Sequence, residues 1–358
     1  MRAVSYTHLD VYKRQGILYE IKQNGKGDAD VLMTLKENYD IAMRHGMPEQ
    51  VPVYSKPVRY NVGLGDVWEK GPAGGGLDGF GCLWASGIGG QTPVPGNYVL
   101  TDITDWKNQV RFPDLKAVDW AEKSEKELKG LDRDTQFMEY CMGNGPFERF
   151  LDLMGLEELT YALMDEPDHC KDFLKAFTEY RIEYIEYIGK YYHPDFVVTF
   201  DDTGYASGLF LSREQYCEFI QPSHKMINDA IYAIGARPIQ HCCGKAETLV
   251  EEFIREGAVA WSSVDPANDI VGILKKYGKQ ITLIGGFDSF GAPAGIDATD
   301  EMMIGEVHRV IDTYGPYGSF IMGNHIVQGA TPEETMRRVL LLREEGLRYA
   351  AEAAHGPA

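Results

Sequence analysis

The sequence predicts an α/β fold, a single (β/α)8 or TIM barrel preceded by a helical extension. Two observations support this fold class. Short apolar runs with many β-branched residues alternate with amphipathic helical patterns, and several of the runs end in reactive side chains, as the strands of such a barrel do at their carboxyl ends. At 358 residues and 44% hydrophobic content, the chain has the size of one large barrel.

The strand candidates recur at spacings that leave room for helices between them. Helical patterns follow at residues 213–235 and 246–257. Strand, helix and strand at this spacing predict right-handed βαβ units and a parallel sheet. We expect an eighth strand in the irregular first third, which favours a closed barrel over an open sheet. The seven candidates are VPVY (51–54), QFMEYCM (136–142), DFVVTFDD (195–202), RPIQHCC (237–243), AVAWSSV (258–264), ITLIGG (281–286) and SFIMGN (319–324).

Two segments of the first third have a distinct composition. Residues 30–46 read as an amphipathic helix, which we expect to form the N-terminal extension, and Gly46 followed by Pro48 is a usual helix end. Residues 71–97 are rich in glycine but lack the strand, GxGxxG and helix context of a dinucleotide site. We expect them to form a long loop near the barrel mouth.

The first fifteen residues, MRAVSYTHLDVYKRQ, differ from the rest of the chain. They have neither helical periodicity nor the apolar core of a signal peptide. They resemble translated adapter sequence, so we expect a non-native leader at residues 1–15 and one barrel domain over 16–358.

Charge and cysteine content exclude several classes of protein. The chain has 54 acidic and 35 basic side chains, a formal net charge of −19. Such a surface repels phosphate backbones and anionic lipid, so nucleic acid and membrane are excluded as partners. A run of about 18 apolar residues, which a bilayer span requires, does not occur. The six cysteines are too scattered for a disulfide framework, and we expect a soluble cytoplasmic enzyme.

The run RPIQHCC contains the strongest candidate site. The strand period of two puts Ile239, His241 and Cys243 on one face, and Gln240 and Cys242 on the other. If the first face points into the barrel, His241 and Cys243 form a metal-ligand pair and Cys242 packs outward. A disulfide between adjacent cysteines requires a distorted peptide and is discounted. Without further context, such a pair is more often a hydrogen-bonded core histidine and an inert thiol than a metal site.

Further polar side chains stand at the ends of other strand candidates. Asp201 and Asp202 end one run, Asp288 follows LIGG, and Asn324 and His325 end the last run. Each aspartate also has a structural interpretation: the pair at 201–202 suits the cap of a loop, and the third suits a helix N-cap.

Three other polar residues have a structural interpretation. Glu139 lines the pocket if its side chain is on the inward face of its strand, and lies in solvent if it is on the outward face. His224 and His308 lie on amphipathic helical patterns, where structural or exposed roles are expected.

Three motifs resemble the uroporphyrinogen decarboxylase superfamily. They are the D-D-x-G segment from Asp201 with its FLS continuation, the H-x-C-G motif at 241–244, and TPEE at 331–334. The earlier segment DGFGCLWASGIGGQTPVPGN resembles the methyltransferase-type branch of anaerobes, which includes corrinoid-dependent O-demethylase-like and methylcobamide:coenzyme M methyltransferase-like proteins. The resemblance covers most of the chain beyond Lys36.

The resemblance implies one of two chemistries. The decarboxylases use no metal and hold tetrapyrrole carboxylates with arginines; here the corresponding region, VPVYSKPVRYNVG, supplies Arg59 but no arginine pair. The methyltransferase branch binds zinc through an H-x-C pair and a later cysteine. The pair carries over to His241 and Cys243, whereas the place of the later cysteine falls at Asn324.

The departure at Asn324 leaves the third zinc ligand open. We expect His325, with Asp288 as the main competitor. One cysteine and two N or O ligands leave more positive charge on Zn²⁺, which then suits Lewis-acid chemistry.

The expected reaction moves a methyl group from a small methylated donor, such as a methyl ether, to a corrinoid (cobalamin) on a partner protein. Zinc would bind the leaving heteroatom. Asp202 or Asp288 would orient a ligand or protonate the leaving group, and Tyr205 would hydrogen-bond the substrate.

Two alternatives remain open at this stage. One is a metal-free decarboxylase of the uroporphyrinogen type. The other is a non-catalytic barrel that binds a corrinoid or tetrapyrrole, which the missing third cysteine favours. Tightly bound zinc distinguishes the enzyme from both.

Overall fold

The structure is a computed structural model that describes residues 33–87, 90–323 and 326–355. The leader expected at 1–15 lies outside the described residues, and so do Asn324 and His325. Among the described helices, none is both long enough and apolar enough to cross a membrane.

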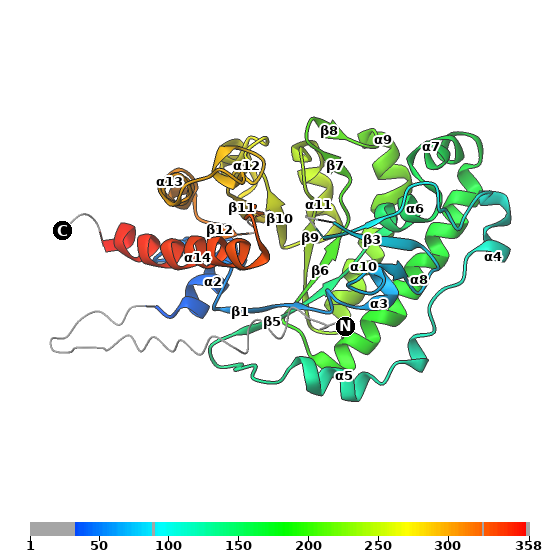
Figure 1. The fold of residues 1–358 in the computed structure, drawn as a ribbon, viewed down its shortest axis with the longest axis horizontal. Helices are drawn as coiled ribbons and strands as arrows, with labels where there is room; N and C mark the ends of the chain where they lie inside the picture. Colours follow the sequence, from blue (N-terminus) through cyan, green and yellow to red (C-terminus); the bar gives the residue numbers. More distant parts are fainter. Residues whose placement is uncertain (1–32, 88–89, 324–325, 356–358) are drawn as a thin grey trace. The chain divides into compact units, whose positions relative to one another are not determined.

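A curled parallel sheet of seven strands is the centre of the fold, surrounded by helices (Figure 1). The strand order is β1-β5-β6-β9-β10-β11-β12, so strands adjacent in this sheet follow one another along the chain, as successive βαβ units require. The strands are β1 (Val58–Val62), β5 (Phe137–Met142), β6 (Phe196–Phe200), β9 (Arg237–His241), β10 (Ala260–Val264), β11 (Thr282–Gly286) and β12 (Phe320–Gly323).

Six of the seven predicted runs became strands of this sheet, and β1 supplies the strand expected in the first third. The run 51–54 did not: it makes one parallel bridge, between Val53 and Met322 of β12. Pro52 and Pro57 lack the N–H that a continuous ladder needs. The prediction of a closed eight-stranded barrel is therefore too strong, because the sheet is a half-barrel of TIM-like curvature.

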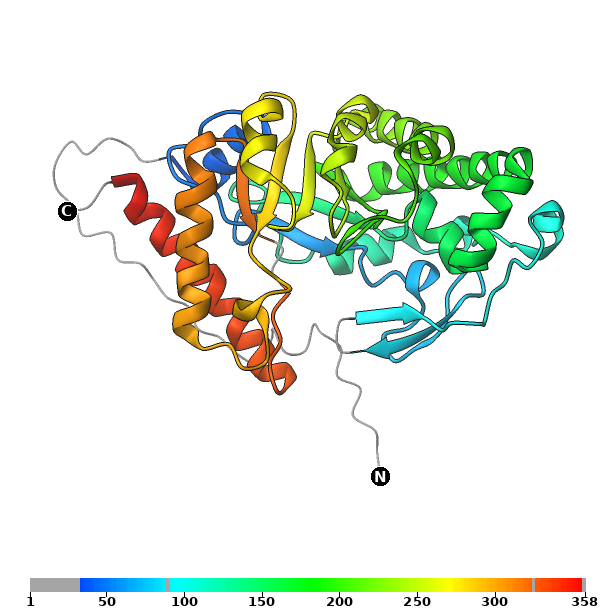
Figure 2. The same ribbon diagram turned by 90° about the horizontal axis from the view of Figure 1, so that it is seen from above.

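Helices cover the outer face of the sheet. Figures 1 and 2 show α8 beside α10, and α13 beside α14. The α-helices are α2 (Leu35–Met43), α3 (Val67–Lys70), α4 (Trp106–Gln109), α5 (Trp120–Glu127), α6 (Pro146–Met154), α7 (Leu156–Asp165), α8 (Pro167–Tyr192), α9 (Arg213–Gln215), α10 (Gln221–Ala233), α11 (Val250–Glu256), α12 (Ile270–Tyr277), α13 (Asp300–Tyr314) and α14 (Pro332–His355). A π-helical turn, η3 (Tyr216–Ile220), joins α9 to α10.

The predicted N-terminal helix is present as α2 and covers the amino ends of the strands. Thr34 and Glu37 form a capping box that starts it. Tyr39 is fully buried in the cluster on the concave face of the sheet, against the rings of Phe137 and Phe196, which begin β5 and β6. Burial of an apolar side chain of this size stabilises a fold by roughly 1.5–3 kcal/mol, and the Tyr39 hydroxyl, which is buried without a hydrogen-bond partner among the described residues, offsets part of this gain.

The glycine-rich segment 71–97 is not the long loop that was predicted. It contains a three-stranded antiparallel sheet of β2 (Gly76–Leu77), β3 (Leu83–Gly87) and β4 (Gly90–Pro93). Asp78 organises this sheet, because its carboxylate accepts the backbone N–H of Cys82, the indole N–H of Trp84 and a hydrogen bond from Arg149 of α6. These hydrogen bonds to a buried carboxylate hold the segment in place. Its strands therefore lack the regular alternation of apolar residues from which strands are predicted.

Candidate metal centre

The carboxyl ends of β6 and β9 bring three potential ligands together. His241 is the last residue of β9, Cys243 follows two residues later, and Asp202 lies two residues beyond β6. One ligand atom from each lies within 4.8 Å of the other two. Among the described residues, this is the group of histidine, cysteine and acidic side chains that meets the geometry of a metal site. We call it the Asp202–His241–Cys243 cluster.

Short contacts hold the cluster together. The Cys243 backbone N–H donates to Asp202 Oδ1 at 2.7 Å, and the same oxygen lies 3.9 Å from His241 Nε2. The Cys243 sulfur lies 3.4 Å from His241 Nε2. A nitrogen, a sulfur and an oxygen therefore converge on one point.

The orientation of the His241 ring is fixed by its neighbours. Its Nδ1 lies 3.0 Å from the Ser262 hydroxyl of β10, and its plane stacks on Phe200 at a centroid distance of 4.1 Å. Nε2 is thereby turned toward the cluster, the arrangement that second-layer hydrogen bonds give to ligating histidines. Burial lowers the pKa of His241, which favours the neutral imidazole that binds metals.

The thiol of Cys243 is held protonated in the metal-free protein. Burial first, and then the nearby carboxylate of Asp202, raise the pKa of Cys243. Because only the thiolate is a good ligand, a bound cation has to offset both effects.

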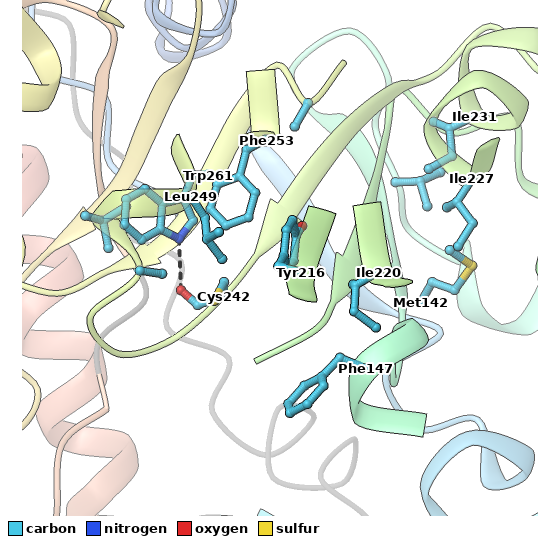
Figure 3. Packing of buried hydrophobic residues seen from close by; sticks show 14 of the residues in the cluster. Met142, Phe147, Tyr216, Ile220, Ile227, Ile231, Cys242, Leu249, Phe253 and Trp261 are labelled. Carbon is cyan, nitrogen blue, oxygen red and sulfur yellow. Dashed lines mark hydrogen bonds between the residues drawn. The ribbon is translucent and has the colours of Figure 1, made fainter. Parts of the chain in front are cut away.

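The strand phase predicted for RPIQHCC is confirmed. Ile239 lies in the concave cluster, whereas Cys242 is fully buried in the outer cluster beneath the helices. Figure 3 shows Cys242 next to Trp261, whose indole N–H donates to the Cys242 carbonyl at 2.9 Å. Both cysteines are free thiols, so the discounted disulfide is absent between these described residues.

Asp201 has a structural position that differs from that of Asp202. Its fully buried carboxylate accepts the backbone N–H groups of Phe147 and Glu148, in the first turn of α6, at 3.2 and 2.7 Å. It also lies 2.7 Å from Nε2 of the fully buried His224. The capping interpretation holds for Asp201, and His224 is a buried structural residue.

Other residues predicted for the site lie apart from the cluster. Asp288 Oδ1 accepts the N–H groups of Phe290 and Gly291, so this carboxylate caps a turn and does not join the cluster of described ligands. Tyr205 lies on a short hairpin with 46% of its surface exposed, and its ring packs on Phe210.

Two of the remaining residues make structural contacts. Arg59 donates to the carbonyl of Glu127, and His308 lies 2.6 Å from Glu345. Neither contact belongs to the cluster.

Sequence analysis missed two polar side chains near the cluster, Glu148 and Lys70. Burial, followed by the negative charge of Asp202, raises the pKa of Glu148 well above its usual range. The Lys70 ammonium lies 5.6 Å from the centre of the Phe200 ring that stacks on His241. The position of Glu148 in the first turn after β5 was the available signal, because such turns face the active site of barrel folds.

Glu139 is inside the half-barrel and not in solvent. Its side chain is fully buried, accepts a hydrogen bond from the Tyr54 hydroxyl, and leaves Oε2 without a partner among the described residues. Burial raises the pKa of Glu139 to about 7, although the bond from Tyr54 opposes the shift.

Solved structures share this fold. A methyltransferase from Methanosarcina mazei aligns with a TM-score of 0.61 and 15% identity, over 87% of this chain and 99% of the other. The IOLI protein with a bound zinc atom (TM-score 0.34, 11% identity, 66% and 83% of the two chains) and an uncharacterised protein (0.32, 12%, 66% and 61%) are too distant to inform on this chain. At 15% identity, the first likeness establishes the fold.

Family membership comes from the sequence itself. None of the curated proteins matches this chain. Residues 87–345, more than two thirds of the chain, match the family described as uroporphyrinogen decarboxylase (URO-D). The chain therefore belongs to the uroporphyrinogen decarboxylase family.

Proposed function

We propose that this protein is a zinc-dependent methyltransferase that moves a methyl group from a small methylated donor to a corrinoid protein. The observation that supports the proposal is the Asp202–His241–Cys243 cluster at the carboxyl ends of the strands. The alternative reaction, metal-free decarboxylation of a tetrapyrrole, would not use such a set of metal ligands. The likeness in fold to a methyltransferase agrees with the proposal.

The donor set of the cluster fits zinc. Catalytic zinc sites usually have three protein ligands and one position for water or substrate, and imidazole, thiolate and carboxylate are the ligands zinc takes. The Ser262 contact on His241 supplies the outer hydrogen bond that such sites require. Asp202, which we expected to orient a ligand or deliver a proton, is thus our candidate for the third ligand in place of His325.

Zinc bound here would supply a Lewis acid to the heteroatom that loses the methyl group. The protein then has to deliver a proton to that heteroatom. Glu148 suits this role, because burial and the negative charge of Asp202 raise the pKa of its carboxyl well above the usual range, which favours the protonated form. Beside Cys243 lies a small hollow with both apolar walls (Val264, Phe287, Phe290 and Ile326) and polar walls (Ser263, Asp265 and Ser289), and we propose that the donor approaches the cluster from this side.

Zinc content of three purified proteins tests the proposal. The unaltered protein should hold about one zinc ion per chain. Cys243→Ser should lose most of it, whereas Cys242→Ser should retain it, because only Cys243 faces the cluster. Equal loss from both variants, or an unaltered protein that binds no zinc, would reject the proposal in favour of a metal-free decarboxylase or a binding role.

A further inference from the structure

Two consecutive serines of β10 contact the two ligands contributed by β9 and its end. The hydroxyl of Ser262 lies 3.0 Å from Nδ1 of His241, and the hydroxyl of Ser263 lies 3.4 Å from the sulfur of Cys243. In the described part of the chain, that sulfur is the hydrogen-bonding partner found for the Ser263 side chain. His241 and Cys243 therefore each contact a different serine of β10.

A regular strand cannot place two consecutive side chains in one site, because its side chains alternate between faces. Trp261, before the two serines, and Val264, after them, both pack in the outer cluster. The pairing with β11 explains how: Ser262 is opposite Ile284 and Val264 is opposite Gly285, so Ser263 is an extra residue. Ser263 is a β-bulge, which turns its side chain to the same side as that of Ser262.

The bulge has an energetic cost. Ser263 has a φ of +68°, a left-handed conformation that a residue with a Cβ rarely adopts. Across the ladder, a Cβ on Gly285 would lie 2.5 Å from the carbonyl oxygen of Val264, so only glycine allows the bulged backbone to approach. Strain of this kind persists where the surrounding structure enforces it, and it concentrates at functional sites.

We infer that Ser263 is a positioning residue of the candidate centre, held on a bulge so that its hydroxyl hydrogen-bonds the sulfur of Cys243. In the loaded protein the hydroxyl donates to the thiolate and reduces its electron donation, so the metal keeps more positive charge. Ser262 does the corresponding work for His241. This inference rests on the proposed function only for its consequence at the metal; the contact itself exists in the metal-free protein.

The metal-free protein provides the first test. The S–H stretch of Cys243 is isolated as the infrared difference between the unaltered protein and Cys243→Ser. Ser263→Ala and Ser263→Gly both remove the hydroxyl, and both should shift this band by the same amount. Ser263→Gly should melt at a higher temperature than Ser263→Ala, because glycine relieves the strain at positive φ. A band that stays unchanged in both variants overturns the inference, even if melting temperatures change.

The metal-loaded protein provides the second test, with Co²⁺ as a spectroscopic substitute for zinc. Loss of the hydroxyl should move the sulfur-to-cobalt charge-transfer band to lower energy in both Ser263 variants, because a thiolate without this hydrogen bond donates more strongly. An unmoved band overturns the role at the metal. If the unaltered protein takes up no cobalt, the proposed function fails, and the infrared result alone decides the role of Ser263.

Discussion

Asp201 and Asp202 are adjacent in the chain and have different surroundings. Asp201 is fully buried and bonded to α6 and His224, whereas the side chain of Asp202 is 35% exposed and faces His241. The chain turns at the end of β6, so neighbouring carboxylates point to different partners. A strand end thus supplies one structural and one potentially reactive group.

The identity of the third ligand can be decided by zinc affinity. Asp202→Ala should weaken zinc binding by more than about 100-fold, because loss of a ligand exceeds the roughly 10–100-fold effect of an outer-layer partner. Asp288→Ala should leave affinity unchanged, since its carboxylate caps a turn. His325→Ala is measured beside them. A larger loss in His325→Ala than in Asp202→Ala would restore the original prediction and refute the assignment of Asp202.

Glu139 should make the stability of the protein depend on pH. Burial raises its pKa from 4.5 to about 7 in the folded state. Between about pH 4.5 and 7, the unfolded chain releases this proton while the folded protein keeps it, so stability falls as the pH rises through this window. Above pH 7, the ionised buried carboxylate leaves the fold less stable by roughly 3 kcal/mol.

Glu139→Gln should remove this effect and still accept the hydrogen bond from Tyr54. We expect the variant to be more stable than the unaltered protein at pH 8 and of similar stability at pH 4.5, measured by urea unfolding at both pH values. If the two proteins show the same change in stability between these pH values, Glu139 does not titrate in this range.

At the scale of elements, the start of α6 depends on a group from another strand. Gly145 and Pro146 begin the helix without a side-chain cap of its own. Asp201 accepts two N–H groups of the first turn, and a Cβ on Gly145 would lie 2.5 Å from that of Asp201. One of these two N–H groups belongs to Glu148, so Asp201, the residue after β6, positions both the start of the helix and the backbone of the candidate proton donor.

Asp201→Ala should therefore destabilise the fold by about 3–5 kcal/mol, since it leaves buried His224 and two helix N–H groups without their acceptor. Asp202→Ala is the matched control, and loss of its partly exposed carboxylate, which accepts one backbone N–H, should cost only about 1 kcal/mol. Thermal or urea unfolding of the metal-free variants measures both. Similar losses from the two changes would show that Asp201 is not the structural member of the pair.

At the scale of the whole molecule, the half-barrel collects the ends of several strands on one side and α2 covers the other. The concave cluster beneath the site is apolar, apart from the buried carboxyl of Glu139. In the proposed reaction, the substrate would therefore approach the cluster from the carboxyl ends of the strands. The net charge of −19 on the chain favours neutral or cationic methyl donors over a polyanion such as a tetrapyrrole carboxylate.

The unaltered protein should convert a reduced corrinoid to its methylated form when a methoxylated donor is present, seen as replacement of the cob(I)alamin spectrum by that of methylcobalamin. Cys243→Ser should lose more than about 100-fold of this activity if the sulfur is a metal ligand. Release of carbon dioxide from uroporphyrinogen without added metal would support the decarboxylase instead.

Local pattern alone was enough to predict much of the fold and two of the three residues of the Asp202–His241–Cys243 cluster. The strand period of two identified His241 and Cys243 as the inward pair and Cys242 as an outward residue, because alternation is a property of the extended backbone itself. Local periodicity also predicted helix α2 and six strands of the central sheet.

Only the tertiary structure decided which strand ends meet. Asp202 joins the cluster because β6 lies next to β9 in a curled sheet, a pairing between residues about forty positions apart that no local period encodes. The bulge at Ser263 and the incomplete closure at Val53 likewise depend on the partner strand. Burial of Glu139, and with it the raised pKa, depends on how the whole sheet curves around it. Backbone periodicity is local and can be read from the chain, whereas proximity, register and desolvation are set by contacts distant in sequence.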